Sequence, residues 1–314
     1  MLHKELMDQA AAALRKAALN EDAKAYLLAN QELNGLFKKG AKRYLGGDDL
    51  LESISTLKAL NARGFACSTD FMGESIRKEE EANKATAEFL RVCEAIGTHG
   101  LNSSISLDLS HIGLVIDKEL AMQNLSKICD AAEKIGKEVV ISAEGIDRTD
   151  SIHEVYKTLS GKYPHLCITV QAYLYRSKDD LIELKKLPNK IRLVKGAFDV
   201  PDHVAYKRGE ALNKVYLEYA YGLLSTDHHC SIATHDILIQ EAVKEILLTI
   251  QPDKERYEFE SLLGIENDLL AALKEEGHRC RIYVVYGQEW YLYLLNRVAE
   301  YPPSIFQVLL DIMT

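Results

Sequence analysis

Eight short runs of apolar and β-branched residues, each followed by a longer segment with helical spacing, constrain the fold of this chain most strongly. A return to a parallel neighbour needs a crossover, usually a helix, so this alternation predicts a parallel sheet. The strands are expected at residues 65–69, 104–109, 138–143, 166–171, 191–195, 231–234, 257–260 and 281–285. Eight such units favour an α/β fold closed into a (β/α)8 barrel of parallel strands, with an open doubly wound sheet as the alternative.

The first 60 residues follow a different pattern, in which apolar residues recur at helical spacing. Leu6, Ala10, Ala13 and Ala17 fall on one stripe of the first segment. A second periodic segment begins after Asp49, whose carboxylate can accept from the free N–H groups at a helix start. We therefore expect an N-terminal helical arm over residues 1–60 and a barrel over residues 61–314.

Charge and hydropathy argue against several classes of protein. The 314 residues carry a formal net charge of −9 without a basic stripe for phosphate contacts, which argues against nucleic-acid binding. No uninterrupted apolar run approaches the ~18 residues of a membrane span, and the N-terminal segment lacks the apolar core of a signal peptide. From these two features we expect a cytoplasmic protein. The six cysteines form no CxxC pair, so we expect no metal site.

Polar residues lie at or just after the C-terminal ends of most expected strands, where the active sites of (β/α)8 barrels lie. These residues are Asp70, Asp108, Ser142, Gln171, Thr234, His235, Asp236, Glu260 and Tyr283. Strand ends are often polar without a function, so no single position carries much weight. The small residues after Lys195 would let a ligand approach the backbone N–H groups. Further on, Tyr293, Arg297 and Glu300 share one face of an expected helix.

Several segments in sequence order carry a resemblance to a known family. They are residues 170–176 (VQAYLYR), 192–198 (RLVKGAF), 232–236 (IATHD), 257–260 (YEFE) and 283–291 (YVVYGQEWY). Together they resemble the proline dehydrogenase family, flavin-dependent enzymes that oxidise proline, in its short monofunctional bacterial form. The resemblance covers roughly residues 45–314. It implies a (β/α)8 barrel, a final helix near residues 288–300 over the barrel mouth, and bound FAD.

The resemblance also implies the cofactor site. Its residues would be Gln171, Arg192, Val194, Gly196, Ala197, Thr234, His235, Asp236, Glu260, Arg297 and Glu300. Arg192 matches the arginine near flavin N5, and Gln171 matches the amide at the edge of the isoalloxazine ring. Thr234 and His235 match the pair at the pyrophosphate. A cation near N5 would stabilise the reduced, anionic flavin.

The substrate pocket implied by the resemblance departs from the family. It would contain Asp108, Ser142, Phe198, Leu262, Tyr283, Tyr293, Asn296 and Arg297. Catalytic roles would fall to Arg192, Asp108, Tyr283, Tyr293, Arg297 and Glu300. The family has Lys in place of Asp108, Asp in place of Ser142, Tyr in place of Phe198, Gln in place of Glu260 and Arg in place of Asn296. One of the three cations that hold the substrate carboxylate in the family remains, so binding of a free carboxylate is expected to weaken.

Three functions stay open at this point. The chain oxidises proline to 1-pyrroline-5-carboxylate, or it oxidises a related amine whose carboxylate is absent or masked, or it is a non-catalytic flavin-binding relative. In the first two, a neutral amine loses hydride to flavin N5. The partner would be a small-molecule amine or amino acid. The resemblance implies a quinone acceptor and peripheral membrane contact. Residues 305–313 are apolar enough for that contact, but a helix packed on the barrel is the favoured interpretation of this segment.

Overall fold

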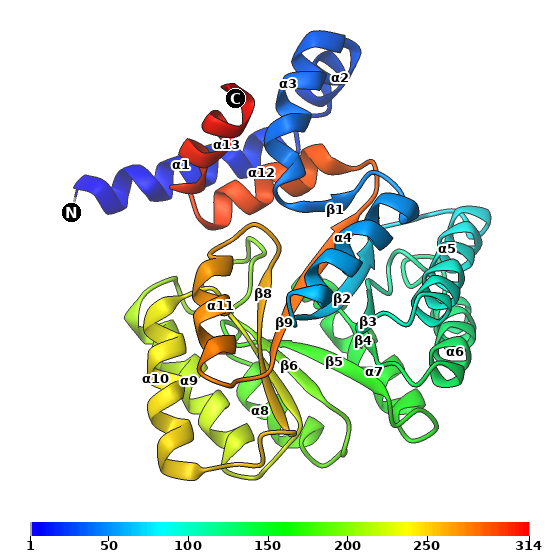
Figure 1. Cartoon of the computed structure of the whole chain (residues 1–314), viewed down its shortest axis with the longest axis vertical. Helices are drawn as coiled ribbons and strands as arrows, with labels where there is room; N and C mark the ends of the chain where they lie inside the picture. The colour runs from blue at the N-terminus through cyan, green and yellow to red at the C-terminus, as the bar shows by residue number, and fades with distance from the viewer. Residues whose placement is uncertain (1, 74, 314) are drawn as a thin grey trace.

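The computed structural model describes residues 2–73 and 75–313, and its centre is a closed parallel barrel (Figure 1). The barrel strands are β2 (Ala66–Phe71), β3 (Ser103–Leu107), β4 (Val139–Ile141), β5 (Leu166–Gln171), β6 (Ile191–Val194), β7 (Cys230–Ala233), β8 (Tyr257–Leu262) and β9 (Cys280–Tyr286). Each pairs in parallel with the next, and β9 pairs with both β8 and β2. The predicted barrel is therefore confirmed, and the open sheet is wrong.

Helices follow the strands on the outside of the barrel. They are α5 (Glu79–Thr98), α6 (Lys118–Lys134), the short helix η1 (Ile146–Arg148), α7 (Thr149–Ser160), α8 (Ser177–Leu184), α9 (Glu210–Leu224), α10 (Ile237–Ile250) and α11 (Asn267–Glu275). Their apolar faces pack on the outward-facing strand residues, such as Leu193, Phe259 and Val284, which are fully buried in the main core. This burial explains why the strands carry β-branched and apolar residues at alternate positions.

The N-terminal segment contains α1 (Leu2–Ala18), α2 (Glu21–Ala29), α3 (Gln31–Lys42) and α4 (Leu50–Ala62). Asp49 caps α4 by accepting from the Glu52 N–H at 3.0 Å, as the sequence predicts. A short strand that the sequence did not predict, β1 (Leu45–Gly47), interrupts the helical pattern and pairs with β9 outside the barrel. Its pairing depends on tertiary contact, because its two glycines give no strand signal.

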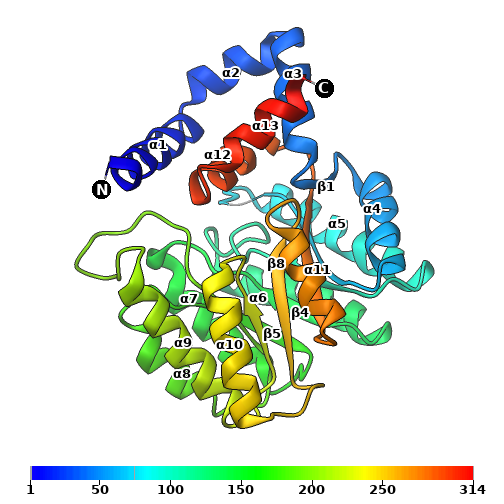
Figure 2. The ribbon, with the colours of Figure 1, turned by 60° about the vertical axis from the view of Figure 1, so that its left-hand side comes forward.

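Two C-terminal helices, α12 (Trp290–Glu300) and α13 (Ser304–Met313), gather with α1 to α3 at one end of the barrel (Figures 1 and 2). A second hydrophobic core joins these elements around Tyr44, Trp290 and Val308. A β-carbon on Gly40 of α3 would lie 2.7 Å from a Val308 methyl group, so the two helices pack closely. Helix α13 therefore packs on the arm, and the expectation that it packs on the barrel is wrong.

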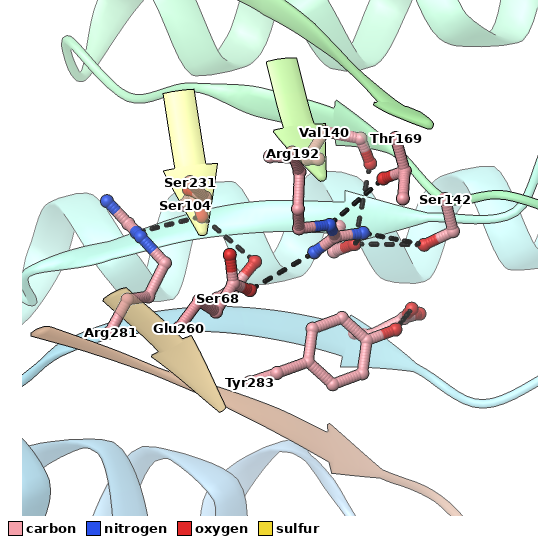
Figure 3. Close-up of polar contacts among 12 residues, drawn as sticks. Ser68, Ser104, Val140, Ser142, Thr169, Arg192, Ser231, Glu260, Arg281 and Tyr283 are labelled. Atoms are coloured by element: carbon pink, nitrogen blue, oxygen red, sulfur yellow. Dashed lines mark hydrogen bonds and ion pairs between the residues drawn. The ribbon is translucent and has the colours of Figure 1, made fainter. Parts of the chain in front are cut away.

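Polar side chains fill much of the barrel interior in two layers. The layer at the N-terminal ends of the strands contains Lys190, Glu258, Glu138 and Arg281. Lys190 Nζ donates to Glu138 Oε2 at 3.0 Å and also to Glu258 Oε1. Arg281 Nε donates to Glu258 Oε1 at 2.8 Å. Barrel interiors are more often filled by branched apolar residues. The second layer, toward the mouth, surrounds Arg192 (Figure 3).

None of the helices within residues 2–73 and 75–313 combines the length and apolar character needed to cross a membrane.

Candidate functional site

One cavity of about 1370 Å³ opens at the C-terminal ends of the barrel strands, beneath α12. It exceeds the usual 300–1,000 Å³ of small-molecule sites. Every residue of the implied sites lines it: Asp108, Ser142, Gln171, Arg192, Val194, Gly196, Ala197, Phe198, Thr234, His235, Asp236, Glu260, Leu262, Tyr283, Tyr293, Asn296, Arg297 and Glu300. The fold thus brings together segments that lie far apart in the sequence.

Arg192, on β6, lies deep in this cavity and is held from several strands (Figure 3). Its Nε donates to Thr169 at 2.9 Å, and one terminal nitrogen donates to Ser106 and Ser142 at 3.1 and 3.2 Å. The other terminal nitrogen pairs with Glu260 at 3.3 Å. Side chains on different strands therefore fix the position of the guanidinium, and Glu260 balances its charge.

Asp70, at the end of β2, forms a second buried pair with Tyr283 of β9. The Tyr283 hydroxyl donates to Asp70 Oδ2, and the Arg192 guanidinium carbon lies 5.1 Å from the centre of the Tyr283 ring. Burial raises the pKa of Asp70 to about 7, although the bond from Tyr283 and the charge of Arg192 oppose this shift. Burial, with Asp70 nearby, raises the pKa of Tyr283 well above its usual value.

Helix α12 covers the cavity with Tyr293, Asn296, Arg297 and Glu300. Arg297 pairs with Glu300 at 2.9 Å. Within the described part of the chain, the buried Arg297 Nε and Tyr293 hydroxyl have no hydrogen-bond partner. Unpartnered buried donors are costly, so these two atoms favour a bound polar group in the cavity.

Basic groups gather at another part of the cavity wall. Lys195 pairs with Asp236 at 2.5 Å, and Arg208 donates to the Gly196 carbonyl at 3.2 Å. Burial lowers the pKa of His235, so its ring is neutral near pH 7 and can donate one N–H. Arg208 is a candidate that the sequence reasoning missed, because it lies outside the segments that carry the resemblance and follows no strand.

Two predicted cofactor residues have structural partners of their own. Asp236 caps α10, accepting from the Leu238 N–H at 2.9 Å. Gln171 Nε2 donates to the Glu144 carbonyl at 3.0 Å.

Gly196, a third predicted cofactor residue, has a φ of +109°. A β-carbon there would lie 2.1 Å from the Tyr173 ring, so both the conformation and the space require glycine.

The donor set of the cavity fits FAD. Lys195, Arg208 and Arg297 offer cationic donors and His235 a neutral one, which suits a diphosphate. Arg192 supplies a fixed cation deep in the same cavity, where an electron-rich ring would be stabilised. Among the described residues no group of three or more His, Cys, Asp or Glu side chains could hold a metal ion.

A closed barrel with a large cavity at the C-terminal ends of its strands, lined by both apolar and charged groups, is typical of an enzyme. The family profile described as "Proline dehydrogenase" matches residues 53–301. The chain belongs to the proline dehydrogenase family.

Individual relatives agree with this assignment. The chain is 33% identical to "Proline dehydrogenase 2" of Bacillus subtilis (strain 168) over 265 residues, 84% of this chain and 88% of that protein. It is 32% identical to "Proline dehydrogenase" of Deinococcus radiodurans over 295 residues, 92% of this chain and 94% of that protein. A crystal structure of proline utilization A (PutA) from Bdellovibrio bacteriovorus, inactivated by N-propargylglycine, shares the fold with a TM-score of 0.79 at 19% identity, over 95% of this chain and 36% of that chain.

Proposed function

We propose that this chain binds FAD and oxidises the C–N bond of proline, or of a closely related cyclic amine, to the imine. Membership of the proline dehydrogenase family and the gathering of the implied site residues around one cavity support this proposal. The family relationship favours proline over the alternatives of a masked amine or a non-catalytic role. Bound FAD would supply a two-electron acceptor that takes hydride from the carbon next to nitrogen.

Residues in different parts of the cavity would contact different parts of the cofactor and the substrate. Lys195, Arg208 and His235 would hold the diphosphate, and Arg192 would hold the ring system. Tyr283 and Tyr293 would form walls against the substrate, with α12 excluding water above it. A dry cavity strengthens each of these electrostatic contacts.

The visible absorption spectrum of the purified protein tests this function. We expect a yellow protein whose flavin absorbance survives desalting and is bleached by proline under anaerobic conditions. Prolinamide and pyrrolidine, added separately, would show whether the free carboxylate is required. A preparation that retains no flavin after saturation with FAD contradicts the proposal, and a yellow protein that proline does not bleach contradicts its substrate.

Replacing Arg208 by glutamine is expected to weaken FAD binding by about 10- to 150-fold. The change removes one charge-assisted hydrogen bond, which is worth about 1.5–3 kcal/mol. Quenching of FAD fluorescence on titration with apoprotein measures the dissociation constant. Lys207→Gln is the matched control, because Lys207 is largely exposed and pairs with Asp202 away from the cavity. Equal dissociation constants for R208Q and K207Q would place the diphosphate elsewhere.

We further propose a quinone as the electron acceptor and contact with the membrane surface through α13. Phe306, Leu309, Leu310 and Met313 are exposed on this helix at i, i+3, i+4 and i+7, which forms one apolar stripe. An amphipathic helix of this kind can lie in the membrane interface.

The variant F306S/L310S is expected to bind phosphatidylcholine vesicles at least about tenfold more weakly than the natural chain. It removes two apolar side chains, each worth about 1.5–3 kcal/mol when fully buried. Co-sedimentation measures the bound fraction. Leu51→Ser, an equally exposed apolar site on α4, serves as the control. A natural chain that stays in the supernatant would contradict membrane contact.

A further inference from the structure

Amine oxidation by hydride loss imposes one further requirement on the site. An alkylammonium ion has no lone pair to form the C=N bond, so it must lose a proton first. With a pKa like that of lysine, about 10.4, on the order of one amine molecule in 10³ is neutral at pH 7. An enzyme acting near neutral pH therefore gains from a base beside the substrate nitrogen.

We propose that Asp70 binds the substrate ammonium and accepts its proton, with Tyr283 orienting the carboxylate. This assignment rests on the proposed function. An N–H bond breaks, its electron pair stays on nitrogen, and an O–H bond forms on Asp70. The nitrogen lone pair would then be free to form the C=N bond as the neighbouring C–H bond gives up hydride, for which FAD, when bound, would be the acceptor.

The geometry around Asp70 suits this role. Asp70 lines the cavity at the end of β2, yet its residue is only 7% exposed. Tyr283 bonds Oδ2, which fixes the carboxylate and leaves Oδ1 to accept from a ligand. The titratable groups around this pair come from four elements. They are Arg192 from β6, Asp108 beyond β3, Tyr286 from β9, and Tyr293 and Arg297 from α12. The unpartnered Tyr293 hydroxyl belongs to the same surroundings, which places a polar ligand beside Asp70.

Four other acids and bases of the cavity are less suited to the task. Glu260 is paired with Arg192, and Glu300 is paired with Arg297. Burial lowers the pKa of His111 to about 4, which makes it a weak base. His235 lies among the cations near Arg208 and Lys195. The pKa of Asp70, raised by burial to about 7, matches proton transfer near neutral pH.

The pH dependence of flavin reduction in a single turnover tests the assignment. In the natural chain the rate should rise with pH to a plateau, with a midpoint near 7. In Asp70→Asn the rate at pH 7 should fall by about 10²–10⁴-fold, and should then increase tenfold per pH unit as the neutral amine accumulates in solution. Tyr283→Phe should shift the midpoint upward, because it removes the hydrogen bond that lowers the pKa of Asp70.

Glu289→Gln is the matched control, because Glu289 lines the rim of the same cavity and pairs with Lys24 at 2.9 Å. This variant should keep the profile of the natural chain. Flavin absorbance and thermal unfolding, measured on every variant, show whether each is folded and loaded. A folded D70N that keeps the midpoint near 7 overturns the role of Asp70 alone. A natural chain whose flavin no amine reduces overturns the proposed function and this assignment together.

Discussion

Replacing Arg192 by alanine is expected to reduce the rate of flavin reduction by about 10²–10³-fold, the usual cost of losing a positioned electrostatic group. The same change should destabilise the barrel. It leaves Glu260, whose side chain is 3% exposed, without its guanidinium partner. Removing one member of a buried ion pair costs about 3–5 kcal/mol, which urea denaturation would measure as a lower free energy of unfolding.

A double variant separates these two effects. R192A/E260Q removes both charges, so most of the lost stability should return while flavin reduction stays slow. Stopped-flow reduction of the FAD-loaded variants, monitored at the flavin absorbance, gives the rates. If the folded double variant reduces its flavin as fast as the natural chain, Arg192 has no part in the chemistry.

Replacing Lys190 by methionine is expected to cost about 3–5 kcal/mol of unfolding free energy at pH 7. The side chains of Lys190 and Glu258 are only 5% and 3% exposed, and Lys190 also bonds Glu138. The variant leaves two carboxylates, Glu138 and Glu258, and one cation, Arg281, in the polar layer at the N-terminal ends of the strands, which gives this layer a net negative charge. K190M/E138Q restores neutrality around the remaining Arg281–Glu258 pair, so it should be more stable than K190M.

The stability difference between K190M and the natural chain should change with pH in a direction set by the pKa of Glu258. Burial alone would raise the pKa of Glu258, but Arg281 and Lys190 outweigh it and hold the pKa well below its usual value. The ionised Glu258 carboxylate therefore stabilises the folded state above its unfolded pKa of about 4.5. This contribution is lost as pH falls toward the lower pKa that Glu258 has in the folded state. Without Lys190 the carboxylate protonates more readily, so the stability gap between K190M and the natural chain should narrow on acidification. A gap that stays constant down to the lowest pH at which both proteins remain folded would contradict this account.

The barrel could be predicted because its strands carry their own signal. Runs such as Leu166–Gln171 are apolar, short and bounded by helical segments, and the predicted and observed ends coincide there. The strand β1 could not be predicted, because Leu45–Gly47 becomes a strand only through its pairing with β9. The division of the chain at residue 60 stays a prediction.

The site could be predicted as a set of positions, but its pairings could not. The sequence predicts that Asp70 and Tyr283 lie at the same end of the barrel, because both stand near the ends of expected strands. Only the closed sheet, in which β2 pairs with β9, shows that their side chains form a hydrogen bond. Arg208 carries no local signal at all. The pairing of Arg192 with Glu260, on strands β6 and β8, likewise depends on the three-dimensional register.

The Arg192 environment has a consequence for how this pocket diverged. The resemblance places an acid at the position of Ser142 and an amide at that of Glu260, whereas this chain has a hydroxyl and an acid there. Both side chains contact Arg192, at 3.2 and 3.3 Å. On this resemblance, the negative charge would lie on the other side of the guanidinium in this chain. An ancestor with both acids, or with neither, would have carried an unbalanced charge inside the barrel, so the two replacements are expected to have been inherited together.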